Sequence, residues 1–227
     1  MKLDKVTKPS GRRYEDACGT AHALDLIGDR WTLLVMRELM LGARRFNDLK
    51  ASLGGISANV LTQRLSELEA AGVVRRAKLP PPASIQVYEL TGWGREAEKV
   101  VLELGRWGAR SPLQDVTMPL SSVSMVLSFR AMFRPERAKG VAVTVVLRVP
   151  EDEEFTLRVE GERLETARGV SAAFDVAITG APGAIARAVY GIEPLDMLER
   201  QCQIGLQGDR DAFGRFARCF SLPEKAG

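Results

Sequence analysis

Cysteines, histidines and long apolar runs are scarce in this sequence, and each shortage excludes a class of protein. The three cysteines, Cys18, Cys202 and Cys219, are an odd number and lie far apart, so they do not form a disulfide framework. This usage is typical of a reducing compartment, and we expect a cytoplasmic protein. No apolar stretch approaches the roughly 20 residues that a membrane span requires, so we expect no membrane partner. The charged first segment lacks the apolar stretch of a secretory signal.

A single histidine limits the catalytic and metal chemistry. His22 has no second metal ligand at a useful spacing, which favours a packed or surface histidine. The second half of the chain has no histidine, so a Ser-His-Asp or Cys-His arrangement cannot form within it. The segment "GAPGAIARAV" does not match a glycine-rich phosphate loop. We therefore expect no enzymatic activity, no cofactor and no metal site.

The length and the charge distribution indicate one or two domains and a basic first half. A chain of 227 residues is long enough for two cores, and 27% of charged residues is ordinary for a globular protein. Residues 1–112 contain 18 Lys and Arg against 13 Asp and Glu, whereas residues 113–227 contain 14 against 16. The basic excess in the first half permits a nucleic-acid partner.

The first half carries a helical pattern that ends in a hairpin. "CGTAHALDLIGDRWTLLVMRELMLG" predicts two helices broken near Gly28, with Asp29 as N-cap of the second and Gly42 as its stop. "RRFNDLKASLG" predicts a short third helix, and "SANVLTQRLSELEAAG" a fourth, which Ser57 caps and Gly72 stops. "VVRRAKL" and "IQVYELT" predict two strands around "PPPAS", and "GWGREAEKVVLELGRWGAR" predicts a long closing helix.

A composition change marks a domain boundary. The segment 111–119, "SPLQDVTMP", combines two prolines with polar residues, and we place the domains at 1–112 and 113–227. Beyond it, short β-rich runs at 140–149, 154–169 and 173–180 predict strands. "APGAIARAVYG" and "PLDMLERQ" predict helices, "CQIGLQG" a strand, and "DRDAFGRFARCF" a last helix capped by Asp209. The fold class is therefore α+β, with a mostly antiparallel or mixed sheet in the second domain.

The predicted fourth helix has two chemically different faces. Leu61, Leu65 and Leu68 share one face, which must be the core. The opposite face is polar and uncharged, and Asn or Gln can pair bidentately with adenine while Thr can touch a thymine methyl. A recognition helix reads bases from its N-terminal part, and basic residues on a following hairpin hold phosphates. The predicted DNA contacts are Ser57, Asn59, Thr62, Gln63, Arg64, Arg75, Arg76 and Lys78.

A solvated helix followed by a polar hairpin is the simpler interpretation, but the order of the elements favours a helix-turn-helix with a wing. The landmarks "IGDRWTLLVMREL", "RRFNDL" and "GISANVLTQRLSELEAAGVVRR" resemble the HxlR-type family of bacterial winged-helix transcriptional regulators. The resemblance covers roughly Tyr14 to Arg110. It implies a homodimer, held by the first and last helices of the domain, that binds double-stranded operator DNA with its two recognition helices in successive major grooves. The three consecutive prolines at the wing tip depart from the family pattern.

Cys18 has two interpretations. In some relatives a cysteine at this position senses oxidants or electrophiles as a thiolate, so the resemblance implies a redox-sensor role here. The alternative is a small buried residue at the start of a helix.

The second half resembles the C-terminal part of the sterol-carrier-protein-type lipid-binding fold. The markers are a strand ending in "TG", an apolar helix after it, and the strand "IGLQGD" before a last helix with Phe213, Phe216 and Phe220. The resemblance implies a five-stranded sheet with helices over one face and an apolar tunnel for a small apolar ligand. The alternative is that the same residues fill a dry core. The residues expected to contact the effector are Phe174, Val176, Ile178, Ile185, Val189, Leu195, Met197, Leu198 and Ile204.

The two halves together predict a dimeric, sequence-specific DNA-binding transcriptional regulator that responds to a small apolar, lipid-like effector. The alternative is a lipid carrier whose winged helix serves only for dimerisation. Loss of DNA affinity on replacement of Gln63 and Arg64 separates the two, because only a regulator depends on those side chains for DNA binding.

Overall fold

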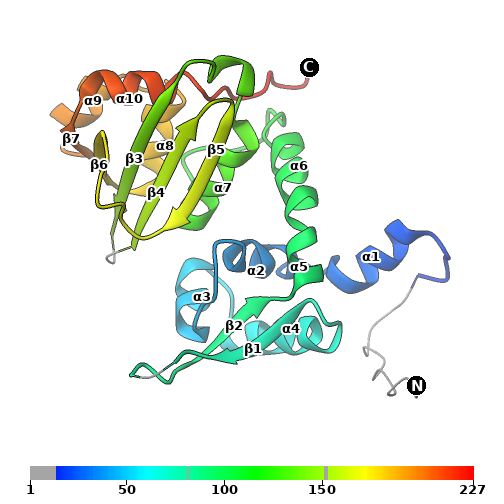
Figure 1. Cartoon of the computed structure of the whole chain (residues 1–227). Coiled ribbons are helices and arrows are strands. Elements are labelled where there is room, and N and C mark those ends of the chain that lie inside the picture. Colours follow the sequence, from blue (N-terminus) through cyan, green and yellow to red (C-terminus); the bar gives the residue numbers. More distant parts are fainter. Residues whose placement is uncertain (1–13, 81, 151–152) are drawn as a thin grey trace. The chain divides into compact units, whose positions relative to one another are not determined.

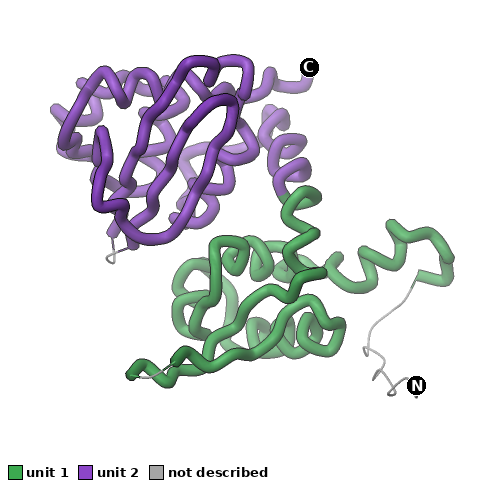
Figure 2. Tube along the Cα trace, viewed as in Figure 1, with its two compact units in different colours: residues 1–101 green, residues 102–227 purple. Residues whose placement is uncertain are grey.

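The structure, a computed structural model, describes residues 14–80, 82–150 and 153–227. The chain divides into two compact units, residues 1–101 and 102–227 (Figure 2). The division falls inside helix α6 (Glu98–Gly108), earlier than the predicted linker. The domain boundary at residue 112 stays a prediction, because compactness alone does not decide where an independently folding domain ends. Among the described residues, no helix combines the length and the hydropathy needed to cross a membrane.

The first unit is a winged helix-turn-helix, with helices first and a two-stranded hairpin after them, as predicted (Figure 1). The hairpin strands pair antiparallel, from Val74 opposite Leu90 to Lys78 opposite Gln86. The elements are α1 (Gly19–Ile27), α2 (Thr32–Leu39), α3 (Phe46–Ser52), α4 (Ala58–Ala70), β1 (Val74–Lys78), β2 (Gln86–Leu90), α5 (Gly92–Glu96) and the start of α6.

The predicted caps of the helices have mixed outcomes. Ser57 is the N-cap of α4, and its hydroxyl accepts a hydrogen bond from the Val60 N–H at 3.2 Å, which confirms that prediction. Gly72 follows α4 with φ of 73°, a left-handed conformation that favours glycine and ends the helix. The prediction for Asp29 is wrong, because Trp31 is the N-cap of α2. The carboxylate of Asp29 instead forms an ion pair with another element, described below.

The predicted long closing helix is interrupted at Ala97, which separates α5 from α6. Thr91 is the N-cap of α5: its hydroxyl accepts from the Gly94 N–H at 3.0 Å and donates to the Gly72 carbonyl at 2.8 Å. Gly94 lies so close to Val73, the residue before β1, that a Cβ there would clash with the Val73 carbonyl oxygen. These contacts hold α5 against the hairpin as a separate short helix. The helical periodicity of the sequence does not show this separation.

The core of the first unit is built on α4 as the sequence predicts. Leu61, Leu65 and Leu68 are at most 1% exposed and pack with side chains from α2, α3 and the hairpin. Full burial of a leucine side chain stabilises the fold by roughly 1.5–3 kcal/mol. The apolar face of α4 is therefore what holds its polar face in a defined orientation.

The second unit is a five-stranded sheet in the order β5-β4-β3-β6-β7. β3 and β6 are parallel and the other neighbouring pairs are antiparallel, so the sheet is mixed and the unit is α+β. The predicted strands and helices are all present. Their bounds are α7 (Ser122–Met132), the 3-10 helix η1 (Pro135–Arg137), β3 (Ala142–Val149), β4 (Glu153–Glu160), β5 (Arg163–Arg168), β6 (Val176–Gly180), α8 (Pro182–Val189), α9 (Leu195–Arg200), β7 (Ile204–Gly208) and α10 (Arg210–Ala217).

Helices cover one face of this sheet (Figure 1). Along β4, Phe155, Leu157 and Val159 are buried, while the alternating residues Arg158 and Glu160 are exposed. Because successive side chains of a strand point to opposite faces, this alternation separates a packed face from a solvated one. The apolar face lies against α8 and α10, α7 packs against α8, and α10 is capped by Asp209 as predicted.

Helix α7 is the element that the sequence pattern did not predict. Its buried residues point in almost every direction around the helix: Val123, Met125, Val126, Leu127, Phe129, Ala131 and Met132. A helix that is apolar on most sides lacks the 3.6-residue alternation by which an amphipathic helix is identified. Phe129 packs against the rings of Phe216, Phe220 and Tyr190, so α7 and the last helix share one aromatic cluster.

The C-terminal segment caps the end of α6. The Lys225 Nζ donates to the carbonyls of Ala109 and Ser111, both at 3.0 Å, and the Ala226 N–H donates to the Arg110 carbonyl at 2.7 Å. The last carbonyls of a helix have no partner within it, and a cation is favourable beside them. Residues from the far end of the sequence therefore complete this helix.

Candidate nucleic-acid interface

The polar face of α4 is open to solvent. Asn59, Thr62, Gln63 and Ser66 are exposed, opposite the buried leucines of the same helix. The 13 residues of α4 follow directly from the Ser57 cap, so the exposed polar side chains begin in its first turns. The structure thus brings five of the predicted DNA contacts, residues 57 to 64, onto one helix and its cap.

Two of these side chains already make contacts along the helix. The Thr62 hydroxyl donates to the Ala58 carbonyl at 2.9 Å, which occupies the hydroxyl proton. The Gln63 Nε2 donates to Glu67 Oε1 at 3.0 Å, one helical turn further on. Each side chain retains unused capacity, because a hydroxyl still has lone pairs and an amide still has an oxygen and a second N–H.

Arg64 lies differently from its neighbours. Its side chain is only 12% exposed and forms ion pairs with Glu67, at 2.8 Å, and with Asp29 in the loop between α1 and α2. The guanidinium therefore links the middle of α4 to the preceding helices. This position suits a residue that holds the helix in place, and the predicted contact of Arg64 with DNA would require its ion pairs to open.

The basic residues of the hairpin are exposed and mostly paired with carboxylates. The Arg75 Nε donates to Glu89 Oε1 at 2.7 Å across the two strands. Arg76 forms an ion pair with Glu69 at 3.1 Å, and its guanidinium lies 5.7 Å from the ring centre of Tyr88. Lys78 is exposed and has no ion pair with any residue that the structure describes. Pro81, at the predicted wing tip, lies outside the described residues.

Sequence reasoning missed the acidic partners of the predicted DNA-binding side chains. Glu67, Glu69 and Glu89 each contact a predicted DNA-binding side chain. A helical spacing of four residues signals the Gln63–Glu67 contact, but the Arg75–Glu89 pair depends on strand register. The surface that faces DNA in our prediction is therefore less basic in the free protein than its Lys and Arg residues suggest.

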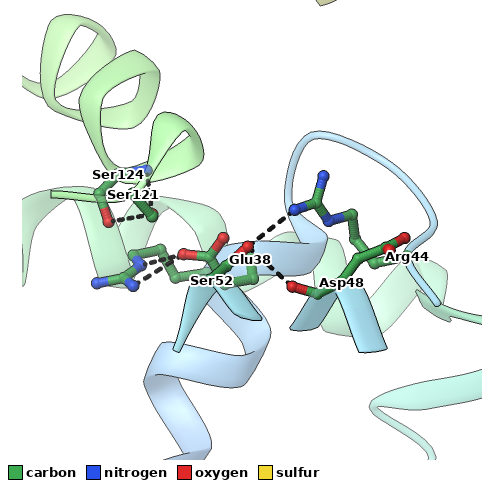
Figure 3. A network of polar contacts seen from close by, with 7 residues as sticks. Glu38, Arg44, Asp48, Ser52, Ser121 and Ser124 are labelled. Atoms are coloured by element: carbon green, nitrogen blue, oxygen red, sulfur yellow. Dashed lines mark hydrogen bonds and ion pairs between the residues drawn. The ribbon is translucent and has the colours of Figure 1, made fainter. Parts of the chain in front are cut away.

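A polar network joins Arg44 to α3 (Figure 3). The Arg44 guanidinium donates to the Ser52 hydroxyl at 2.8 Å, and that hydroxyl donates to the Asp48 carbonyl at 2.9 Å. The backbone of Arg44 pairs with Tyr88 of β2 through two hydrogen bonds, of 2.9 and 2.8 Å. Arg44 therefore connects the helix before the recognition helix to the hairpin, a role the sequence pattern gave no sign of.

Cys18 is the N-cap of α1 and is exposed, so the alternative of a buried residue is wrong. The backbone N–H groups of Ala21 and Thr20 at the start of α1 lower the pKa of the Cys18 thiol below its ordinary value. Helix N-termini favour negative charge, which is the physical cause of this shift. His22, on the same helix, is exposed, and no group of three metal-ligating side chains occurs among the described residues.

The nine predicted effector contacts do not line one open site. The exposed fraction of Met197 is 42%, and Phe174 and Leu195 are partly exposed. The Phe174 ring centre lies 5.6 Å from the Arg148 guanidinium. The remaining six lie in the core between the sheet and its helices and are at most 5% exposed: Val176, Ile178, Ile185, Val189, Leu198 and Ile204.

A pocket of about 460 Å³ lies elsewhere in the second unit. It is found where the parallel strands β3 and β6 end and α8 begins, and it includes Cys202 from the turn before β7. None of the nine predicted effector contacts lines it. The lining residues are Val149, Pro150, Thr179, Gly180, Ala181, Ala184, Cys202 and Gln203.

Comparisons with known proteins match the first half of the chain. Residues 26–115 match the family model described as HxlR-like helix-turn-helix. An uncharacterized HTH-type transcriptional regulator of Synechocystis is 37% identical over 92 residues, which are 40% of this chain and 68% of that protein. The uncharacterized HTH-type transcriptional regulator YvaP of Bacillus subtilis is 37% identical over 86 residues, 37% of this chain and 79% of that protein. Among solved structures, the redox regulator HypR in its reduced form is 33% identical, with a TM-score of 0.38 over 40% of this chain and 90% of its own.

Proposed function

The chain belongs to the HxlR-like helix-turn-helix family of transcriptional regulators, and on that premise we propose that it is a homodimer that binds a specific double-stranded operator. The observation that carries the proposal is the exposed, uncharged polar face of α4 opposite a buried leucine face. Amides and hydroxyls can read base edges through hydrogen bonds, while the basic hairpin residues supply sequence-independent affinity for phosphates.

The proposed dimer uses α1 and α6. Leu24 on α1 and Val100, Leu104 and Trp107 on α6 are large apolar side chains that are exposed in the single chain, Trp107 by 72%. Three of them recur along α6 at intervals of four and three residues, so they form one stripe on that helix. An exposed apolar stripe of this kind supports an interface with a second copy.

For the second unit we propose binding of a small apolar effector, within a sterol-carrier-type fold. The five-stranded sheet with helices over one face agrees with the architecture that the sequence resemblance implies. The pocket at the ends of β3 and β6 supports the proposal more directly than the nine core residues, because it has free volume. Such a ligand regulates the protein only if it binds one arrangement of the recognition helices better than another.

The test of DNA binding begins with selection of duplexes from a random pool by the full-length protein. The selected duplex is then titrated with wild type and with Gln63→Ala, for which we expect a loss of about 1–3 kcal/mol in binding free energy. Lys78→Ala should weaken binding to all sequences and reduce the salt dependence by about one charge. Lys139→Ala, on the exposed side of the second unit, is the matched control.

The outcomes separate the regulator from a lipid carrier. If wild type enriches no sequence and the Gln63 variant binds like wild type, DNA recognition is excluded. A native mass spectrum, with a denatured spectrum beside it, reports the dimer and any bound adduct of lipid mass. A dimer with an adduct lost on denaturation supports the effector proposal, whereas a monomer contradicts the homodimer.

A further inference from the structure

We infer that Glu67 is a specificity-determining positioning residue, which holds the Gln63 amide in the orientation that reads adenine. The inference rests on the proposed function, since it concerns how α4 would recognise a base. It assigns a role in DNA recognition to an acidic residue, although acidic side chains are repelled by the phosphate backbone.

The geometry around Glu67 engages both of its carboxylate oxygens. Oε1 accepts a hydrogen bond from Gln63 Nε2 at 3.0 Å, and Oε2 lies 2.8 Å from the Arg64 Nη1. Arg64 is in turn paired with Asp29 and nearly buried, so it is a fixed cation rather than a mobile surface charge. The chain of contacts therefore runs from the loop after α1, through Arg64 and Glu67, to the exposed Gln63.

The chemistry of the amide makes this contact directional. A carboxylate only accepts hydrogen bonds, so Glu67 can bind the NH₂ side of Gln63 and repels its carbonyl oxygen. With one N–H held by Glu67, the Gln63 Oε1 and the second N–H stay available. Those are the two groups that a bidentate contact with adenine uses, on N6 and N7 respectively. The opposite orientation of the amide would place its oxygen against the carboxylate.

Fixing the amide before DNA arrives also reduces the entropy lost on binding. A free glutamine side chain samples several rotamers, and ordering it at an interface weakens binding by about twofold to tenfold. Of the other predicted amide and hydroxyl contacts on α4, Thr62 is held by the Ala58 carbonyl through its only proton, and the Asn59 side chain has no hydrogen bond with a described residue. Gln63 is thus the amide side chain of α4 whose orientation is set in advance by another side chain.

The test measures base preference rather than affinity. Using the full-length protein and the duplex selected by wild type, the position read by Gln63 is found as the base pair whose preference Gln63→Ala abolishes. At that position the Kd is measured for adenine, for each other base and for 7-deazaadenine, which lacks the N7 acceptor. We expect wild type to prefer adenine by about tenfold to a hundredfold, as for a bidentate amide contact.

The variants separate the orientation of the Gln63 amide from a general loss of the contacts that hold α4 in place. Glu67→Ala should lower the adenine preference by about threefold to tenfold, the loss that corresponds to ordering one side chain, and should reduce the penalty for 7-deazaadenine. Glu67→Gln, whose amide oxygen still accepts the Gln63 N–H, should lie between wild type and Glu67→Ala. Asp29→Asn weakens only the Arg64 ion pair and should keep the wild-type preference within about twofold. Because removal of an acid raises affinity for every sequence alike, the ratio of Kd values isolates the orienting effect.

Three results would overturn the inference. The first is a Glu67→Ala protein that is folded by circular dichroism and keeps the full adenine preference. The second is an Asp29→Asn protein that loses the preference as completely as Glu67→Ala, which would mean that the network only holds the helix. The third is a wild-type protein that selects no sequence, which removes the proposed function and this inference with it.

Discussion

The two units of the chain differ in where the structure places the residues that sequence reasoning assigned to their sites: at the surface in one unit and in the core in the other. In the first unit the predicted polar contacts remain at the surface, where Asn59, Thr62 and Gln63 are exposed. In the second unit most of the predicted apolar contacts lie in the core, as Ile178 and Ile185 do. Polar residues on the outer face of a surface helix stay exposed by default, whereas apolar residues at strand and helix spacing fill a core by default. The predicted DNA contacts are therefore placed where a partner could reach them, whereas most of the predicted effector contacts are not.

The largest expected effect tests whether the predicted effector contacts of the second unit belong to its core. Ile178→Ala should lower the free energy of unfolding by about 2–5 kcal/mol, because removal of a fully buried aliphatic side chain leaves a cavity. Met197→Ala, at an exposed position, should change it by less than about 0.5 kcal/mol. Chemical denaturation followed by circular dichroism measures both. An Ile178 variant as stable as wild type would mean that this side chain borders empty space, and would restore the predicted ligand tunnel.

A smaller effect tests how the recognition helix of the first unit is held. Ser57→Ala removes the side-chain acceptor for the Val60 N–H and should cost about 1 kcal/mol of unfolding free energy. Ser66→Ala lies on the exposed face of the same helix and provides the control, with little change expected. Equal stability of the two variants, measured by thermal unfolding, would show that the N-cap hydrogen bond does not stabilise α4.

Removal of an acidic partner of the hairpin should have a smaller effect, and it should increase DNA affinity rather than lower stability. Glu89→Gln releases Arg75 and should strengthen binding to a duplex of unrelated sequence, by less than about fivefold because an exposed ion pair is worth at most ~1 kcal/mol. Glu165→Gln, on the exposed face of β5, removes the same charge far from the hairpin in sequence. Fluorescence anisotropy at several salt concentrations measures both, and equal gains would assign the effect to net charge alone.

The smallest effect concerns the rate of a thiol reaction. The lowered pKa of Cys18 means that its thiolate is present at lower pH than that of an ordinary cysteine, so alkylation by iodoacetamide should reach half its maximal rate at a lower pH. Burial raises the pKa of the Cys219 thiol and also limits its access, so this residue should react slowly throughout. Peptide mass spectrometry resolves the two sites. An ordinary pH midpoint for Cys18 would argue against a redox-sensor role.

The sequence predicted the elements of the first unit well because their signals are local. The Ser57 cap, the leucine face of α4 and the residues of the hairpin each depend on neighbours within a few positions. The contact of Asp29 with Arg64 was not predictable in that way, because it joins a loop to a distant helix. The pattern at Asp29 resembled a helix cap, and only tertiary structure assigns its carboxylate to a different partner.

The second unit shows two further limits of sequence patterns. Helix α7 has no clear polar face, so periodicity did not distinguish it from any other apolar segment. The pocket brings together Val149, Thr179 and Cys202, which the parallel pairing of β3 with β6 and the antiparallel pairing of β6 with β7 place side by side. The strands themselves were predictable from alternation, but their order in the sheet depends on long-range pairing.

The capping of α6 by Lys225 has a consequence for any attempt to take this protein apart. A fragment that ends at residue 112 keeps the helix but leaves the carbonyls of Ala109 and Ser111 without their cation. A fragment that starts at residue 113 keeps Lys225 but loses the helix end that it binds. Neither piece reproduces the whole, so isolated halves are poor substitutes for the intact chain. A few residues added after Gly227, such as an affinity tag, lie close in sequence to Lys225. They are therefore expected to disturb the hydrogen bonds between Lys225 and the end of α6.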